Sequence, residues 1–100
     1  MRMHNPPHPG RIVKEALESI PISVSEFAAY IGVARGTLSR VLNERAGITP
    51  EMSIKITQAL GIPSTDLLYK IQTDYDFWQA SRAKRKKIAP LKKIGIKTAA

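Results

Sequence analysis

The segment spanning residues 23–43 constrains the fold of this chain most, because it predicts two short helices joined by a tight turn. Ser23 and Glu26 have the spacing of a capping box, in which each side chain accepts a hydrogen bond from the other residue's free backbone N–H. Gly32 can adopt the left-handed conformation that ends a helix and turns the chain sharply. A second helix is predicted to follow over residues 35–43.

The second of these helices has one apolar face and one polar face. Its apolar residues recur at helical spacing and indicate a buried side; they are Leu38, Val41 and Leu42. The opposite face is not needed for the core and carries Arg35, Gly36, Ser39, Arg40 and Asn43. Two short helices around a glycine turn, the second with a free polar face, form a helix-turn-helix.

Further helices are predicted on both sides of this pair. Pro9 suits the first position of a helix that ends before Pro21, because proline there loses no hydrogen bond. Thr49 is a good N-cap and Pro50 a good first residue for a later helix, which Gly61 ends. With a fifth helix after Gly61, the sequence predicts an all-α, five-helix domain.

The fifth helix is expected to begin at a cap formed by Ser64 or Thr65. Its apolar residues Leu68, Ile71, Tyr75 and Trp78 alternate steps of three and four, which predicts a seam for another helix in a homodimer. These residues could instead complete the core of one chain. The aromatic residues of this helix could also stack on bases, but their helical spacing favours packing.

The positive charge of the chain lies at one end. Residues 1–80 carry eight basic and eight acidic side chains, so the whole net charge of +8 lies in residues 81–100. We therefore expect a helix-turn-helix domain over residues 1–80 and a basic tail, either ordered or disordered, over 81–100. The tail could keep the protein soluble, contact DNA non-specifically, or become ordered on a partner protein.

Several function classes are not supported. The chain has no glycine-rich phosphate loop and no nucleophile with a base at a recognisable spacing, so we expect no enzyme and no cofactor. His4 and His8 have no carboxylate or cysteine company, so we expect no metal site. The absence of cysteine suits a reducing cytoplasm, and no segment has the pattern of a membrane span or signal peptide, so a cytoplasmic, nucleoid-associated protein is expected.

The helix-turn-helix segment and the residues on both sides of it resemble known families. The residues around the turn look like the Cro and phage-repressor class; they are Phe27-Ala28, residues 31–33, residues 37–39 and residues 59–61. A longer series looks like the HigA-type antitoxins of bacterial toxin–antitoxin modules; it comprises residues 8–12, 23–26, 32–35, 37–43, 45–52 and 74–80. This resemblance implies a dimer that represses its own operon and binds a HigB-type toxin, a messenger-RNA endonuclease.

The resemblance also assigns contacts to DNA, because the second helix of such a motif enters the major groove by its N-terminal end. Arg35 and Arg40 are the predicted base readers, since arginine can donate two hydrogen bonds to guanine O6 and N7. Ser39 is a further candidate base contact. Candidate phosphate contacts are Ser23, Thr37, Asn43 and Arg45. Without the motif, these side chains would read as helix caps or a solvated helix face.

Two residues depart from the family pattern. Ala34 stands where a serine commonly caps the recognition helix, so this cap is expected to be weaker by about 1 kcal/mol. Gly36 stands where a polar base-reading side chain is usual, and it lowers helix stability by a similar amount. Either the operator permits close backbone approach there, or that position reads nothing.

The sequence thus predicts a sequence-specific transcriptional repressor that acts as an antitoxin. Its expected partners are double-stranded operator DNA, a second copy of the chain and a HigB-type toxin. One alternative is a repressor of the Cro type without a toxin partner. Another is a protein-interaction module that does not bind DNA.

Overall fold

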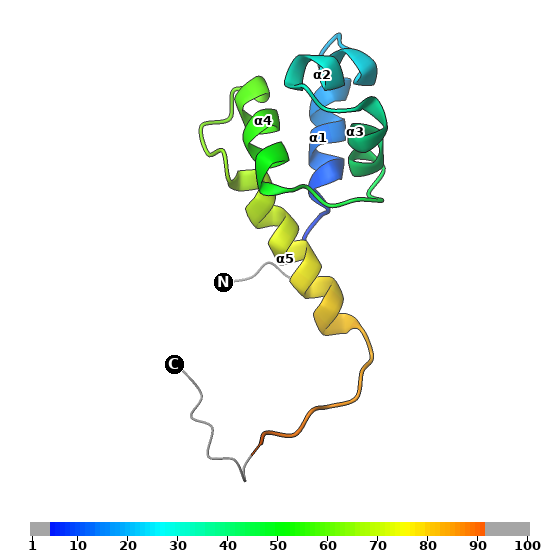
Figure 1. Cartoon of the computed structure of the whole chain (residues 1–100), viewed down its shortest axis with the longest axis vertical. Helices are drawn as coiled ribbons and strands as arrows, with labels where there is room; N and C mark the ends of the chain where they lie inside the picture. The colour runs from blue at the N-terminus through cyan, green and yellow to red at the C-terminus, as the bar shows by residue number, and fades with distance from the viewer. Residues whose placement is uncertain (1–4, 92–100) are drawn as a thin grey trace.

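The computed structural model describes residues 5–91, which form five α-helices and no strand (Figure 1). The helices are α1 (Pro9–Glu18), α2 (Val24–Ile31), α3 (Arg35–Leu42), α4 (Pro50–Leu60) and α5 (Leu67–Arg82). The predicted all-α architecture is confirmed. Over this range no helix has the length and apolar character needed to cross a membrane.

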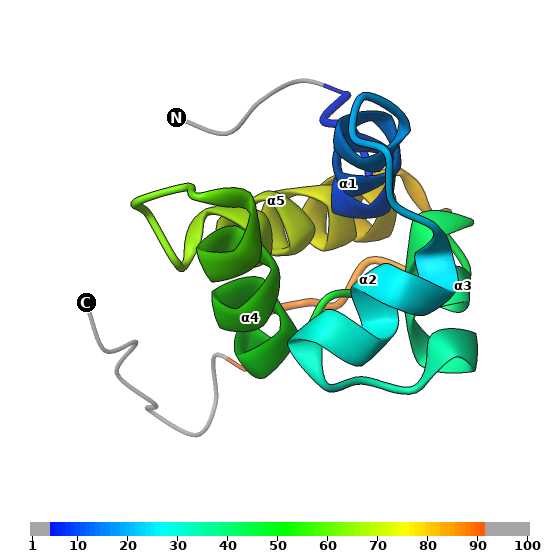
Figure 2. The ribbon, with the colours of Figure 1, turned by 90° about the horizontal axis from the view of Figure 1, so that it is seen from above.

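The first four helices gather at one end of the molecule, and α5 begins beside them and runs away (Figure 1). Helix α1 packs on α3 and α5, while α4 packs on α5. Helix α2 lies between α3 and α4 and contacts both, as the view from above shows (Figure 2). The pair α2 and α3 therefore rests on a support made by the other three helices.

The core lies among α1 to α4 and the start of α5. It contains the predicted inner residues of α3 together with apolar residues from every other helix; its members are Val13, Leu17, Phe27, Ala28, Ile31, Leu38, Val41, Leu42, Ile48, Met52, Ile56 and Leu68. Removing a large apolar side chain of this kind from water contributes about 1.5–3 kcal/mol. The core thus fixes where α3 sits.

Most helix ends follow the predicted capping chemistry. The Ser23 hydroxyl accepts from the Glu26 backbone N–H at 3.0 Å, and the Ser23 N–H donates to the Glu26 carboxylate at 2.9 Å. Gly32 and Gly61 both adopt the left-handed conformation, with φ of 74° and 73°. The Thr49 hydroxyl accepts from the third residue of α4 at 3.2 Å. The capping box, both glycine ends and the Thr49 cap are therefore confirmed.

The start of α5 differs from the prediction, and a cap from Ser64 or Thr65 is wrong. The N-cap residue is Asp66, whose side chain makes no capping hydrogen bond. Its carboxylate instead lies 3.0 Å from the Lys70 ammonium, one turn further along the helix. The pKa of Asp66 is lowered, chiefly by the hydrogen bond from Lys70.

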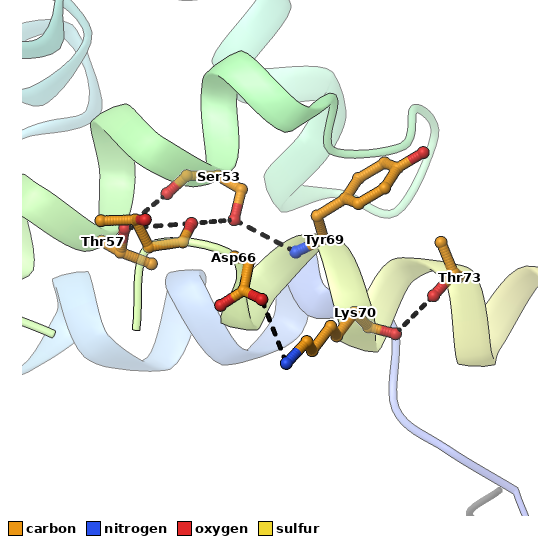
Figure 3. Close-up of polar contacts among 7 residues, drawn as sticks. Ser53, Thr57, Asp66, Tyr69, Lys70 and Thr73 are labelled. Carbon is orange, nitrogen blue, oxygen red and sulfur yellow. Dashed lines mark hydrogen bonds and ion pairs between the residues drawn. The ribbon is translucent and has the colours of Figure 1, made fainter. Parts of the chain in front are cut away.

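The missing cap is supplied by Ser53, a fully buried residue of α4 (Figure 3). Its hydroxyl accepts from the Tyr69 backbone N–H at 3.1 Å and donates to the Thr65 carbonyl at 2.7 Å. The hydroxyl of Thr57, also fully buried, donates to the Ser53 carbonyl at 2.7 Å. A long-range contact replaces a local cap, because α4 places a hydroxyl where α5 has a free N–H.

The start of α1 is fixed by His8, which sequence reasoning treated as an ordinary polar residue. Its Nδ1 accepts from the Gly10 N–H at 2.9 Å, and its ring meets the edge of Tyr75 with centroids 4.9 Å apart. A Cβ at Gly10 would lie 1.8 Å from the Val41 carbonyl oxygen. Glycine at this position therefore permits the close approach of α1 and α3.

Candidate nucleic-acid interface

The turn between α2 and α3 is held by backbone and core contacts together. The Val33 N–H donates to the Ala28 carbonyl at 3.0 Å, just past the left-handed Gly32. Ala28 is almost completely buried, and its small side chain leaves room for α3. Leu38 is fully buried against the same cluster. These contacts orient α3 with one side inward and the other toward solvent.

The outward side of α3 combines positive charge with free polar surface. Arg35, Gly36 and Arg40 are all exposed, and α3 contains no acidic residue. Ala34 provides no side-chain cap, as expected, so the first N–H groups of α3 have no side-chain partner at that position. The uncapped helix start adds partial positive charge to that of the two arginines.

Arg35 is tied to the preceding helix. Its Nε donates to the Ser25 hydroxyl on α2 at 2.8 Å, which leaves the terminal nitrogens of the guanidinium free to donate elsewhere. Sequence reasoning missed Ser25, because the pair lies ten residues apart across a turn and follows no helical spacing. The contact restricts the side chain that was predicted to read a base.

The outward face of α3 has no side chain at Gly36. Gly36 has an ordinary helical backbone, and a Cβ placed on it would meet no atom within 4 Å. Arg40 lies one turn further along the same face. Its side chain makes no hydrogen bond or ion pair with any other described residue. Arg40 is therefore available for a ligand.

The other predicted contacts occupy the flanks and the end of α3. Ser23, Ser39 and Asn43 together line a hollow of about 310 Å³ between α1, α2 and α3. The Asn43 side-chain amide donates to the Ser39 carbonyl at 2.9 Å, so part of its hydrogen-bonding capacity serves the helix end. Thr37 is half-buried on the opposite flank, and Arg45 is exposed just beyond the helix.

Glu44 is the acidic residue next to the end of α3. It adopts a left-handed backbone with φ of 60°, which lets the Arg45 N–H close the helix on the Arg40 carbonyl at 2.8 Å. Its carboxylate lies 3.8 Å from the Arg11 guanidinium on α1. This pairing offsets the only negative charge between Arg35 and Arg45, so the surface at α3 stays positive.

The predicted seam residues have different environments. Leu68 is 1% exposed and belongs to the core of the single chain, so it presents no surface to a second copy. Ile71, Tyr75 and Trp78 are half-buried. Tyr75 packs on His8, and the Arg82 guanidinium lies 4.6 Å from the centre of the Trp78 ring. These three residues keep part of their surface exposed along α5.

A rigid helix pair whose second member carries two exposed arginines and no acid defines a DNA-binding regulator of the helix-turn-helix class. Comparison with known proteins agrees with this assignment. The chain belongs to the helix-turn-helix family, whose characteristic sequence pattern matches residues 13–67.

Three similar proteins show how far the likeness extends. An Escherichia coli K12 protein, the uncharacterized HTH-type transcriptional regulator YddM, is 35% identical over 82 residues, covering 82% of this chain and 86% of that protein. A suggested antidote protein of a plasmid maintenance system from Nostoc punctiforme superposes with a TM-score of 0.72 at 31% identity, covering 78% and 85% of the two chains. The Pseudomonas aeruginosa antitoxin HigA, solved with the higBA promoter, gives a TM-score of 0.70 at 28% identity, covering 75% and 82%. The predicted resemblance to HigA-type antitoxins is confirmed.

Proposed function

We propose that this chain represses its own operon as a homodimer and acts as an antitoxin against a HigB-type messenger-RNA endonuclease. The observation that carries the DNA-binding part is the exposed, acid-free face of α3 with Arg35 and Arg40 on a buried support. The antitoxin part is supported by similarity to a HigA antitoxin solved with its promoter.

In this proposal the N-terminal half of α3 enters the major groove. Arg35 and Arg40 donate to guanine O6 and N7, and Ser39 makes a secondary base contact. The phosphates on either side are bound by residues at the ends and flanks of the motif, namely Ser23, Thr37, Asn43 and Arg45. Residues 1–80 form the DNA-binding domain in this scheme, and residues 81–100 form the basic tail.

The dimer would form through α5, with Ile71, Tyr75 and Trp78 near the seam. One helix-turn-helix unit covers one half-site, so pairing gives the affinity that a two-fold operator needs. Sedimentation equilibrium tests this directly. A monomer mass at concentrations that saturate the operator would contradict the dimer.

The DNA-binding part is tested by mobility shift on the gene's own upstream region, with a scrambled duplex as control. Arg35→Ala and Arg40→Ala should each weaken operator binding by about 1–3 kcal/mol and leave scrambled binding nearly unchanged. Lys55→Gln on α4 provides a matched loss of charge away from α3. Full operator preference in both arginine variants would rule out this use of α3.

The antitoxin part is tested by expressing the adjacent reading frame alone and together with this chain. Toxicity alone and rescue by this chain are expected. If the adjacent reading frame is not toxic, or if this chain does not rescue its toxicity, the remaining interpretation is a repressor of the Cro type without a toxin partner.

A further inference from the structure

We propose that Gly36 is a specificity-determining position of the recognition helix, because its missing side chain opens the path by which Arg40 reaches the bases. The inference rests on the proposed DNA binding by α3. Glycine has no side chain to contact a base, so Gly36 would act only through the space that a side chain would otherwise fill.

The fold itself gives no reason for glycine at this position. Gly32 and Gly61 have positive φ, and at Gly10 an added Cβ would collide with the Val41 carbonyl. At Gly36, by contrast, φ is not positive and an added Cβ meets nothing within 4 Å. Glycine inside a helix is less favourable than alanine. The chain therefore keeps an unfavourable residue where its own packing would accept a better one.

The geometry of α3 connects this space to Arg40. Residues four apart lie on the same helix face, and side chains lean toward the helix N-terminus. An Arg40 side chain that follows this lean would extend over the turn that contains Gly36, where a Cβ built at position 36 has no side-chain atom within 4 Å. Arg40 has no partner among residues 5–91, so nothing in this part of the chain holds it away from that position.

The neighbouring arginine leaves the space open. Arg35 is drawn to one side by its hydrogen bond to Ser25 on α2. Between the two arginines the Cα of Gly36 forms the surface of the helix, so base edges can approach the backbone there. A side chain at position 36 would hold the helix away from the groove floor and shorten the reach of Arg40.

The test is Gly36→Ala in the full chain, because the inference predicts opposite changes in stability and in binding. The melting temperature should rise by about 4–8 °C, as expected for a glycine replaced by alanine in a small domain. Operator affinity should nevertheless fall by roughly 5- to 150-fold, the range for losing one bidentate base contact. Affinity for a scrambled duplex should change little.

Two further variants make the result decisive. Gln58→Ala, at an exposed position of α4, controls for an alanine placed on a helix surface away from α3 and should leave operator affinity unchanged. Combining Gly36→Ala with Arg40→Ala completes a double-mutant cycle, in which the alanine at position 36 should cost little once Arg40 is absent. An equal cost in both backgrounds would overturn the role assigned to Arg40.

The outcomes separate this inference from the proposed function. If the wild-type chain does not prefer its operator over scrambled DNA, the proposed function fails and the inference fails with it. If the wild-type chain prefers its operator and Gly36→Ala binds it as tightly or more tightly, only the inference is overturned.

Discussion

At the scale of single residues, the hydrogen bond from Arg35 to Ser25 restricts the Arg35 side chain before DNA is bound. An arginine that is ordered before binding loses less conformational freedom when it meets a base. Ser25→Ala should therefore weaken operator binding by about 0.5–1.5 kcal/mol, the usual cost of immobilising one long side chain. The stability of the fold should change by less than about 0.5 kcal/mol, because both residues are exposed.

A competition titration with operator and scrambled duplexes measures this effect. The same substitution in an Arg35→Ala background serves as the control, because Ser25 then has no guanidinium to hold. A loss of affinity that persists in that background would show that Ser25 contacts DNA itself or supports α2.

His8 is the residue that gives the fold a dependence on pH. Only neutral imidazole can accept the Gly10 N–H at Nδ1, and burial lowers the pKa of His8 below its ordinary value near 6.5, against the opposing charges of Glu44 and Asp76. The folded state thus binds the proton more weakly than the unfolded state. Stability should be complete above pH 6.5 and should fall as the pH drops through the lowered pKa.

Chemical denaturation between pH 7.5 and pH 5 tests this expectation. The free energy of unfolding should fall with a slope of at most about 1.4 kcal/mol per pH unit, the limit for one proton. His8→Asn keeps a good N-cap that does not titrate, so its profile should be nearly flat in this range. Equal slopes in both proteins would show that His8 does not titrate with folding.

Residue roles were predictable only where they depend on local sequence. The capping box at Ser23 and the left-handed Gly32 follow from spacing and backbone preference alone. The contact of Ser25 with Arg35 depends on where α2 and α3 come to lie, and no spacing in the sequence encodes that distance. The His8 cap spans only two residues and was missed because histidine is not among the usual N-cap residues, while its packing on Tyr75 depends on where α5 lies. Arg35 and Arg40 were predicted as exposed members of α3 and lie on its surface, and their contact with bases stays a prediction.

At the scale of elements, the helices were predicted well because α1 to α4 have clear apolar periodicity and local end signals. Helix α5 has much weaker periodicity. The start of α5 was missed because its N–H groups find their partner on α4 rather than in the preceding turn. Ser53 interrupts an apolar pattern and reads as a neutral position, although it is fully buried. A buried hydroxyl joining two helices has no signature in the sequence of either one.

Ser53→Ala should therefore destabilise the whole fold. It removes the acceptor of the Tyr69 N–H and the shorter of the two donors to the Thr65 carbonyl, which keeps only the Thr57 hydroxyl at 3.4 Å. Leaving one buried group of this kind unsatisfied costs about 1–3 kcal/mol. Thermal unfolding followed by circular dichroism measures the loss. Ser64→Ala is the matched control, since Ser64 is one of the two local caps that the sequence predicted and the structure does not use. If Ser64→Ala lost more stability than Ser53→Ala, the local cap from Ser64 would be the correct assignment.

At the scale of the whole molecule, the net positive charge and the folded domain occupy different parts of the chain. Residues 1–80 are neutral overall, and the described part of the basic segment, residues 81–91, is exposed at the end of α5 and beyond it. The prediction for residues 92–100 lies outside the described residues. We expect the exposed basic segment to add non-specific attraction to DNA, while α3 supplies discrimination.

Replacing the four basic residues at positions 84–87 with glutamine tests this division in the full chain. Each lost phosphate contact flattens the slope of log affinity against log salt by about 0.9, so the slope should fall by at most roughly 3.6. Operator and scrambled duplexes should weaken alike, and their ratio should be kept. An unchanged slope would exclude the segment from DNA, and a changed ratio would make it a base reader.

The contact between Gly10 and the Val41 carbonyl also limits how this protein can evolve. If random variants were selected for folding alone, position 10 should stay glycine, because every other residue would push α1 and α3 apart. That constraint acts on any descendant, whatever DNA sequence it recognises. Lineages that changed operators would therefore keep this helix crossing, and the orientation of α3 would be inherited unchanged.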